Sequence, residues 1–162
     1  MGKLNLIEQE YSSAVGKFKE EWFSNSEFEK WYSFVTDELP EKEKIVYLIV
    51  ILHEQVINGG FHQYFVNGYG QFASITIECL KEVGAVEKAK LLRSAYRLIN
   101  KEELDDHKFR KKLIKQKIKG LFIEDSLYEP LGKLDDEFYD SQEEIEHLLV
   151  KYLIKDDSAY TD

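Results

Sequence analysis

The sequence has 162 residues, of which 43% are hydrophobic and 33% charged, and this balance is typical of a single soluble domain. Its one cysteine, Cys79, excludes an intrachain disulfide and a thiolate zinc cage, while 14% aromatic residues beside two prolines exclude disordered and low-complexity chains. The apolar run 45–52 is shorter than the ~20 residues of a membrane span, and the N-terminus lacks the apolar core of a signal peptide, so we expect a cytoplasmic protein.

Charge is distributed unevenly along the chain. The net charge of −9 divides into −6 for residues 1–80, +7 for residues 81–119 and −10 for residues 120–162. Acidic ends repel nucleic acid and anionic membranes and attract basic partners over a Debye length of ~8 Å. The segregation also favours a weak homodimer, in which the acidic end of one copy contacts the basic stretch of another. Neutralisation within one molecule, or a surface that serves solubility alone, are the alternatives.

Hydrophobic spacing predicts helices from the N-terminus onward. Residues 7–22 and 28–39 each carry apolar side chains at helical spacing, with Ser26 as the expected N-cap of the second helix. Pro40 suits the start of a third helix, whose segment 45–52 is apolar all round and is expected at the centre of the fold. A buried strand is the alternative for 45–52, but charged helix formers precede it and the pattern continues beyond strand length.

Glycines divide the middle of the chain into further helices. The run 58–60 is expected to end the central helix before a short segment over 61–67. The apolar stripe over 72–83 predicts a helix that points Cys79 inward and stops at Gly84.

The next two predicted helices are basic. Residues 85–99 place apolar side chains on one face, and a single further helix is expected over 109–121 with a basic surface from Lys108 to Lys119. The opposite face of the first of these helices carries a cationic stripe at i, i+3, i+7 and i+11, formed by Lys90, Arg93, Arg97 and Lys101.

The C-terminal part of the chain is acidic and helical. A short helix is expected over 131–138, and Ser141 with Glu144 forms an S-x-x-E capping box at the start of a last helix over 145–152. The sequence therefore predicts an all-α fold with one compact domain of about seven helices. Its expected parts are an N-terminal helical pair at 1–39, a main region at 41–155 and a frayed acidic tail at 156–162.

Candidate catalytic and metal-binding motifs are incomplete. His53 and Glu54 begin the zinc-protease pattern H-E-x-x-H, but Ile57 occupies the position of the second ligand. His62 lies beyond the glycine break, and the turn formed by Asn58, Gly59, Gly60 and Phe61 fits a helix end better than a phosphate-binding nest. We therefore expect no catalytic residue, metal or cofactor. An uncharacterised hydrolase around His53, Glu54 and His62 is kept as the third hypothesis.

Carboxylates are concentrated near the C-terminus, where ten lie within positions 124–146. Like charges four residues apart cost ~0.2–0.5 kcal/mol per pair on a helix, so the cluster does not assist folding. Carboxylates about 5–6 Å apart present a charge density that can replace a phosphate backbone for a basic protein, although a solvated acidic face is the alternative. The candidate partner-binding residues are Asp135, Asp136, Glu137, Asp140, Glu143, Glu144 and Glu146.

Three segments resemble a known family: HEQVINGGFHQYFVNGYG at 53–70, KEVGAVEKAKLL at 81–92 and LDDEFYDSQEEIEHLLVKYL at 134–153. Together they are similar, over roughly residues 41–155, to the small, acidic, all-helical bacterial DNA-mimic family, long catalogued as a domain of unknown function. The pattern of that family is N-G-G-F, an aromatic pair and N, then L-D-x-x-F-Y. Here it is met by Asn58 to Phe61, Tyr64, Phe65, Asn67, Leu134, Asp135, Phe138 and Tyr139.

The resemblance implies an all-α fold and an acidic surface that occupies the DNA site of a transcription regulator or nucleoid protein. The basic middle segment departs from an all-round acidic mimic. Our leading hypothesis is a non-enzymatic interaction protein whose acidic C-terminal helices bind a basic DNA-binding protein, with no direct contact to nucleic acid or membrane. The alternative is a nucleic-acid-binding protein that uses the basic helices at 88–119.

Overall fold

The helices form because apolar side chains recur at helical spacing and give each helix one face to bury. The computed structural model describes residues 3–24 and 26–159, and no strand occurs among them. The predicted all-α fold is therefore confirmed. The helical elements in chain order are α1 (Lys3–Val15), η1 (Glu20–Phe23), α2 (Phe28–Ser33), η2 (Phe34–Glu38), α3 (Glu41–Val66), η3 (Tyr69–Phe72), α4 (Ala73–Glu82), α5 (Val86–Ile99), α6 (Asp106–Ile114), α7 (Lys119–Phe122), α8 (Tyr128–Asp140) and α9 (Ile145–Ala159).

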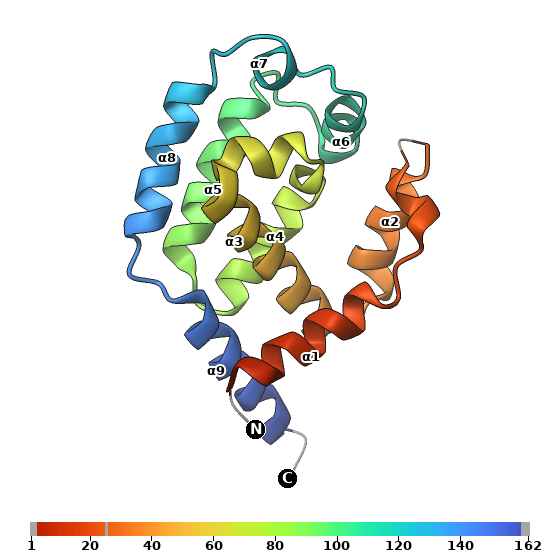
Figure 1. The fold of residues 1–162 in the computed structure, drawn as a ribbon, viewed down its shortest axis with the longest axis vertical. Coiled ribbons are helices and arrows are strands. Elements are labelled where there is room, and N and C mark those ends of the chain that lie inside the picture. The colour runs from red at the N-terminus through yellow and green to blue at the C-terminus, as the bar shows by residue number, and fades with distance from the viewer. Residues whose placement is uncertain (1–2, 25, 160–162) are drawn as a thin grey trace.

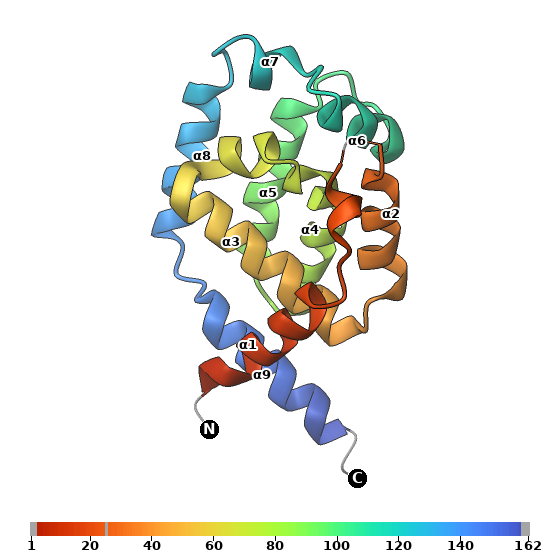
Figure 2. The same ribbon diagram turned by 45° about the vertical axis from the view of Figure 1, so that its right-hand side comes forward.

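Helix α3 passes through the middle of the fold, and α1, α4, α8 and α9 pack around it (Figures 1 and 2). Its apolar segment 45–52 is buried apart from the half-buried Val50, which confirms its predicted central position. Burial of each such aliphatic side chain contributes ~1.5–3 kcal/mol. Within the described residues, α3 is also the one helix long and apolar enough to cross a membrane, and 56% of its apolar window is buried inside the domain.

A sharp kink divides α3 into two helical segments. Gly59 and Gly60 leave helical geometry, and Gly60 has a φ of 77°, which costs an L side chain roughly 1–2 kcal/mol. The second segment continues to Val66 and buries the aromatic side chains of Phe61, Tyr64 and Phe65. The predicted end of the first segment at 58–60 is thus confirmed, because the chain turns there before the next helix begins.

The single helix predicted over 109–121 is wrong. The chain forms α6 and α7 instead, and Gln116 between them has a φ of 58°. A straight helix would place Ile118 on the face opposite Phe109, since nine residues correspond to about two and a half turns. The break allows both side chains to be buried, at 6% and 1% exposure.

Two predictions for the N-terminal helices are also wrong. Helix α1 ends at Val15 instead of continuing to Trp22, and the linker that follows brings the Phe18 ring to 4.9 Å from the ring of Tyr47. The predicted N-cap Ser26 does not cap α2, because that helix begins at Phe28 with no side-chain cap. The break predicted at 24–26 includes Asn25, which lies outside the described residues.

Helix α4 contains the cysteine. The predicted stop at Gly84 is confirmed, since this residue has a φ of 89° directly after the helix. Cys79 is a buried free thiol, as predicted, and its burial raises its pKa to about 12. The thiol is therefore neutral at physiological pH.

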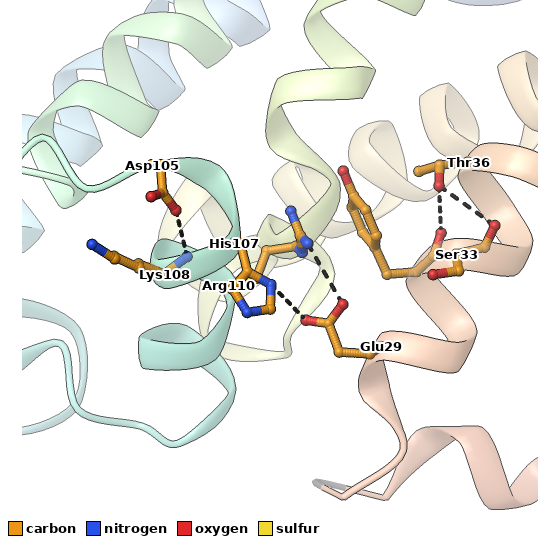
Figure 3. A network of polar contacts seen from close by, with 8 residues as sticks. Glu29, Ser33, Thr36, Asp105, His107, Lys108 and Arg110 are labelled. Atoms are coloured by element: carbon orange, nitrogen blue, oxygen red, sulfur yellow. Dashed lines mark hydrogen bonds and ion pairs between the residues drawn. The ribbon is translucent and has the colours of Figure 1, made fainter.

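Helix α2 is fixed to α6 by polar contacts (Figure 3). The Glu29 carboxylate lies 3.6 Å from Nη2 of Arg110 and 3.5 Å from Nδ1 of His107. The Arg110 guanidinium also lies 3.6 Å from the centre of the Tyr32 ring, and the Arg110 side chain is only 9% exposed. These contacts attach the N-terminal helices to the second half of the chain.

Helices α8 and α9 are separated at Ser141, the expected break. Helix α9 then crosses α1, so the beginning of α1 and the end of α9 lie at the same end of the molecule (Figure 2). Helix α9 continues to Ala159, past the start of the expected tail at Asp156, while residues 160–162 lie outside the described part of the chain.

Candidate protein-interaction surface

Helix α8 presents acidic side chains because its other face is fixed by packing. Leu131 and Phe138 are each 1% exposed, on a helix that contacts α3 and α5. The Tyr139 hydroxyl donates a hydrogen bond to the carbonyl oxygen of Val56 in α3, at 2.8 Å. The remaining face is open to solvent and displays Asp136, Glu137 and Asp140.

Asp135 belongs to the interior joint of α8 with α3. Its Oδ1 accepts a hydrogen bond at 2.8 Å from the backbone N–H of Phe61, the first residue after the kink. A β-carbon at Gly60 would lie 2.3 Å from Oδ2 of Asp135, so this contact requires glycine at that position. Burial raises the pKa of Asp135, and this effect outweighs the opposite effect of the Phe61 hydrogen bond.

The two halves of the family pattern therefore meet in space. N-G-G-F provides Gly60 and the Phe61 N–H, and L-D-x-x-F-Y provides Asp135, which binds that N–H. The ring of Phe138 also meets the ring of Phe61 edge-on, with centroids 5.6 Å apart. Sequence reasoning identified a helix end in N-G-G-F but missed its pairing with a segment more than seventy residues away.

Glu143 is also used inside the fold. Its two carboxylate oxygens accept hydrogen bonds from the backbone N–H groups of Glu87 and Lys88, at 2.8 and 2.7 Å. These groups belong to the first turn of α5, where N–H groups lack helical partners and a negative charge is stabilising. Ser141 accepts a hydrogen bond from the Glu143 N–H at 3.2 Å, not from Glu144 as the predicted capping box requires.

Lys88 of α5 is buried against Phe138 of α8, a structural role that the sequence analysis did not predict. It is 4% exposed, its ammonium lies 4.1 Å from the centre of the Phe138 ring, and it donates to the Phe138 carbonyl oxygen at 3.2 Å. Burial lowers the pKa of Lys88, while Glu143 and Glu87 raise it. The only sequence signal was a lysine within the apolar stripe of α5, next to Ala89.

Five of the seven predicted partner-binding carboxylates remain exposed, and we call them the acidic face. Within the described residues no ion pair with a basic side chain neutralises any of them. The acidic face consists of Asp136, Glu137, Asp140, Glu144 and Glu146.

Two hollows adjoin this face and share His53, Ile145 and Glu146. One, of about 310 Å³, includes Ile57 and Tyr139, which are 52% and 47% exposed. The other, of about 280 Å³, lies between α1, α3 and α9 and has Glu8, Glu54 and Glu146 among its lining residues. Lys88 also lines the first hollow, whereas the described lining of the second contains no lysine or arginine. The second hollow thus combines apolar side chains with carboxylates, which suits a cationic side chain with an aliphatic stem.

Three residues of the predicted basic stripe lie on α5, where Arg93 is half-buried and Lys90 and Arg97 are exposed. The predicted extension of the stripe to Lys101 is wrong, because α5 ends at Ile99 and Lys101 lies exposed in the turn that follows. Arg97 lines a hollow of about 680 Å³ between α5 and α8 together with Lys133 and two acidic residues, Glu129 and Glu137. Charges of both signs therefore meet in this groove. Lys101 lies in a different hollow, with Lys112, Lys117 and Lys119, at the end of α5.

The candidate histidines have different neighbours in the fold. His53 lies 6.0 Å from the Phe138 ring between ring centroids, whereas His62 stacks on Tyr128 and contacts the carbonyl oxygen of Leu121 at 3.2 Å. In the part of the chain that the structure describes, no group of three or more His, Cys, Asp or Glu residues is placed to hold a metal ion.

A comparison with protein-family models matches residues 37–156 to the model described as DMP19-like protein. The chain belongs to the DMP19-like family. Neither the curated proteins nor the solved structures contain a match. The matched region includes the Asp135–Phe61 joint and the whole acidic face, and it leaves α1, η1 and α2 outside the DMP19-like part.

Proposed function

We propose that this DMP19-like protein is a non-enzymatic interaction protein whose acidic face binds a basic DNA-binding protein in place of DNA. The observation that carries the proposal is the set of five exposed carboxylates, of which three lie on α8, Glu144 lies just before α9 and Glu146 lies in its first turn. Their like charges are unfavourable to one another within the folded chain, and a cationic surface would relieve that repulsion.

The placement of Asp135 and Glu143 sharpens the proposal. Because both accept internal backbone hydrogen bonds, they hold the surface in shape instead of contacting the partner. The hollow between α1, α3 and α9 provides apolar contact for the stem of a lysine or arginine side chain, whose charge reaches Glu146. The partner is therefore expected to present lysine or arginine side chains from its DNA-binding surface.

The basic stripe is the less favourable surface for this chain. A DNA-binding groove needs cations without carboxylates between them, but Arg97 shares its hollow with Glu129 and Glu137. A net charge of −9 adds a long-range repulsion of nucleic acid.

The test is capture of DNA-binding proteins on the immobilised full chain, followed by elution with duplex DNA. A variant that neutralises four members of the acidic face, Asp136→Asn, Asp140→Asn, Glu144→Gln and Glu146→Gln, should lose the proteins that DNA elutes. Its matched control removes four exposed charges outside the face, Glu20→Gln, Glu21→Gln, Asp37→Asn and Glu38→Gln. The control should retain binding to these proteins. Added salt should weaken the binding of the unmodified chain steeply, because ions screen charged surfaces.

Two outcomes would contradict the proposal. Equal losses in both variants would mean that net charge alone attracts the captured proteins. Direct retardation of DNA by the purified protein, insensitive to the neutralised acidic face, would instead favour nucleic-acid binding by the basic helices.

A further inference from the structure

A hollow of about 290 Å³ lies where the end of α5 meets α6 and α7, at the opposite end of the molecule from α9 (Figure 1). Its described lining contains no member of the acidic face. The walls come from the end of α5 and the turn after it, from α6, and from the linkers on either side of α7. A cavity of roughly half this volume holds benzene, so the hollow has room for one ring and one small charged group.

Two internal contacts shape the walls. The Asn100 side chain holds the turn after α5, because it donates to the Leu104 carbonyl oxygen at 2.9 Å and accepts from the Leu104 N–H at 3.1 Å. Gly120 lets the linker after α7 return onto that helix, since a β-carbon there would lie 2.7 Å from Cδ1 of Leu127. The hollow is therefore formed by the fold itself, which reduces the cost of ordering its walls around a ligand.

The base of the hollow is apolar. Phe109, Ile118 and Leu127 line it and are each 6% exposed or less, so they form its deepest part. Ser126 adds an exposed hydroxyl group to the wall. Such a base gives an apolar or aromatic group a surface on which to pack.

The charged part of the lining is mainly cationic. Four lysines and two glutamates give it a net charge of +2, in a chain whose net charge is −9. They are Lys101, Lys112, Lys117, Lys119, Glu102 and Glu124. Lys112 and Glu102 form an ion pair. Among residues 3–24 and 26–159, no ion pair is formed by the other three lysines or by Glu124.

Three cationic side chains thus share one hollow with a single unpaired carboxylate. All three lysines are exposed, so a dissolved anion can reach them without any opening of the fold. Like charges around one hollow repel one another, and a bound anion relieves that repulsion. A phosphate monoester carries about −1.5 to −2 at neutral pH, which matches the net charge of the lining. Lysine ammonium groups bind phosphate oxygens through charge-assisted hydrogen bonds.

We propose that this hollow binds a small phosphate monoester with an apolar or aromatic body. The phosphate oxygens accept hydrogen bonds from the ammonium groups of Lys101, Lys117 and Lys119, while the body packs on the apolar base. A nucleic-acid duplex is too wide to enter a hollow of this volume. The proposal therefore gives part of the basic segment a role that does not require nucleic acid, and it is independent of the acidic face.

Calorimetric titration of the full chain with phenyl phosphate tests the proposal. Saturable binding that weakens with added salt is expected, because ions screen the contact between lysines and phosphate. Two further titrations separate the parts of the ligand. Inorganic phosphate has the charge without the ring and phenol has the ring without the charge, so each should bind about tenfold more weakly or worse.

Variants assign the binding to the lysines of the hollow. Lys117→Gln combined with Lys119→Gln should weaken the binding of phenyl phosphate about tenfold or more. The matched control, Lys108→Gln combined with Lys111→Gln, removes two exposed lysines of α6 that do not line the hollow. It changes the net charge by the same amount and should leave the affinity nearly unchanged. All four side chains are exposed, so both variants should fold.

The unpaired carboxylate provides a test of opposite sign. Glu124→Gln removes the negative charge that opposes the ligand and should tighten the binding of phenyl phosphate about twofold to threefold. Asp125→Asn makes the same change of charge at an exposed neighbour outside the lining and should have a smaller effect.

Three outcomes would overturn the proposal. The first is an absence of saturable phenyl phosphate binding, and the second is an equal loss in the two double lysine variants, which would make net charge alone responsible. The third is binding of duplex DNA that is lost with Lys117 and Lys119, which would assign these lysines to nucleic acid. The first two outcomes leave the acidic face untested, so failure here is distinguishable from failure of the proposed function.

Discussion

The basic segment 86–119 and the acidic segment 128–146 each concentrate one sign of charge in the sequence, but the fold uses the two sets of charges differently. In the basic segment, Lys88 and Arg110 are buried against aromatic rings, and Arg97 shares a groove with carboxylates of α8. In the acidic segment, Asp135 and Glu143 bind backbone N–H groups, while six carboxylates stay exposed, the five of the acidic face and Glu129. A count of charges therefore overestimates the surface available to a partner in both segments.

The strongest way to break this comparison is to disrupt the joint that holds the acidic segment on α3. Gly60→Ala introduces a β-carbon at a φ of 77° and 2.3 Å from Oδ2 of Asp135, so we expect a loss of more than about 3 kcal/mol. Thermal unfolding measures it. Gly132→Ala is the control, because a β-carbon there meets nothing within 4 Å and alanine favours the helix by about 1 kcal/mol. Equal melting temperatures for the two variants would contradict the structure.

The basic segment gives the next largest effect. Arg110→Ala removes a buried guanidinium that contacts Tyr32 and Glu29, and we expect a loss of about 2–3 kcal/mol in the free energy of unfolding. Its neighbour Lys111 is exposed, so Lys111→Ala should change the free energy by less than about 0.5 kcal/mol. Chemical denaturation compares the pair. Similar losses in both would mean that charge, and not burial, makes Arg110 important.

Within the acidic segment, two neighbouring glutamates should behave differently. Glu143→Ala leaves two N–H groups of α5 without a partner and should cost about 1–2 kcal/mol, the value of a helix cap. Glu144→Ala should leave stability nearly unchanged but weaken partner binding, because Glu144 is exposed. Denaturation and capture assays on both variants distinguish the structural role of Glu143 from the binding role of Glu144. A Glu144→Ala variant less stable than Glu143→Ala would contradict this assignment.

The smallest expected effect is a pH dependence at His53. Burial lowers the pKa of this imidazole below 6.5, as does Lys88, while Glu146 opposes both. Glu8 and Glu54 line the same hollow. Since the unfolded chain binds the proton more readily, stability falls as the pH decreases below about 6.5. His53→Gln should reduce this slope in unfolding measured between neutral and mildly acidic pH, and an unchanged slope would assign it to other groups.

Much of the fold follows from local sequence patterns. The burial of 45–52 and the stop at Gly84 depend on helical spacing and on glycine, so both predictions were confirmed. The continuous helix over 109–121 failed because the core required Ile118 on the same side as Phe109. That requirement arises only when other helices surround the segment, so local spacing does not contain it.

The candidate site was harder to predict from the sequence than the fold. The acidic residues were identified as a group, but their separation into internal and exposed members depends on contacts across more than fifty positions, such as that from Glu143 to Lys88. Nothing local distinguishes Glu143 from Glu144.

The buried thiol of Cys79 is an intrinsic probe of how often the fold opens locally around α4. Because this cysteine is the one thiol in the chain and its pKa is raised to about 12, a thiol-reactive reagent modifies only molecules whose α4 has transiently moved away from the core. The modification rate under native conditions therefore measures the frequency of that opening without an engineered probe. A bound partner that stabilises the native fold would lower the rate of Cys79 modification, even when the partner contacts a distant surface.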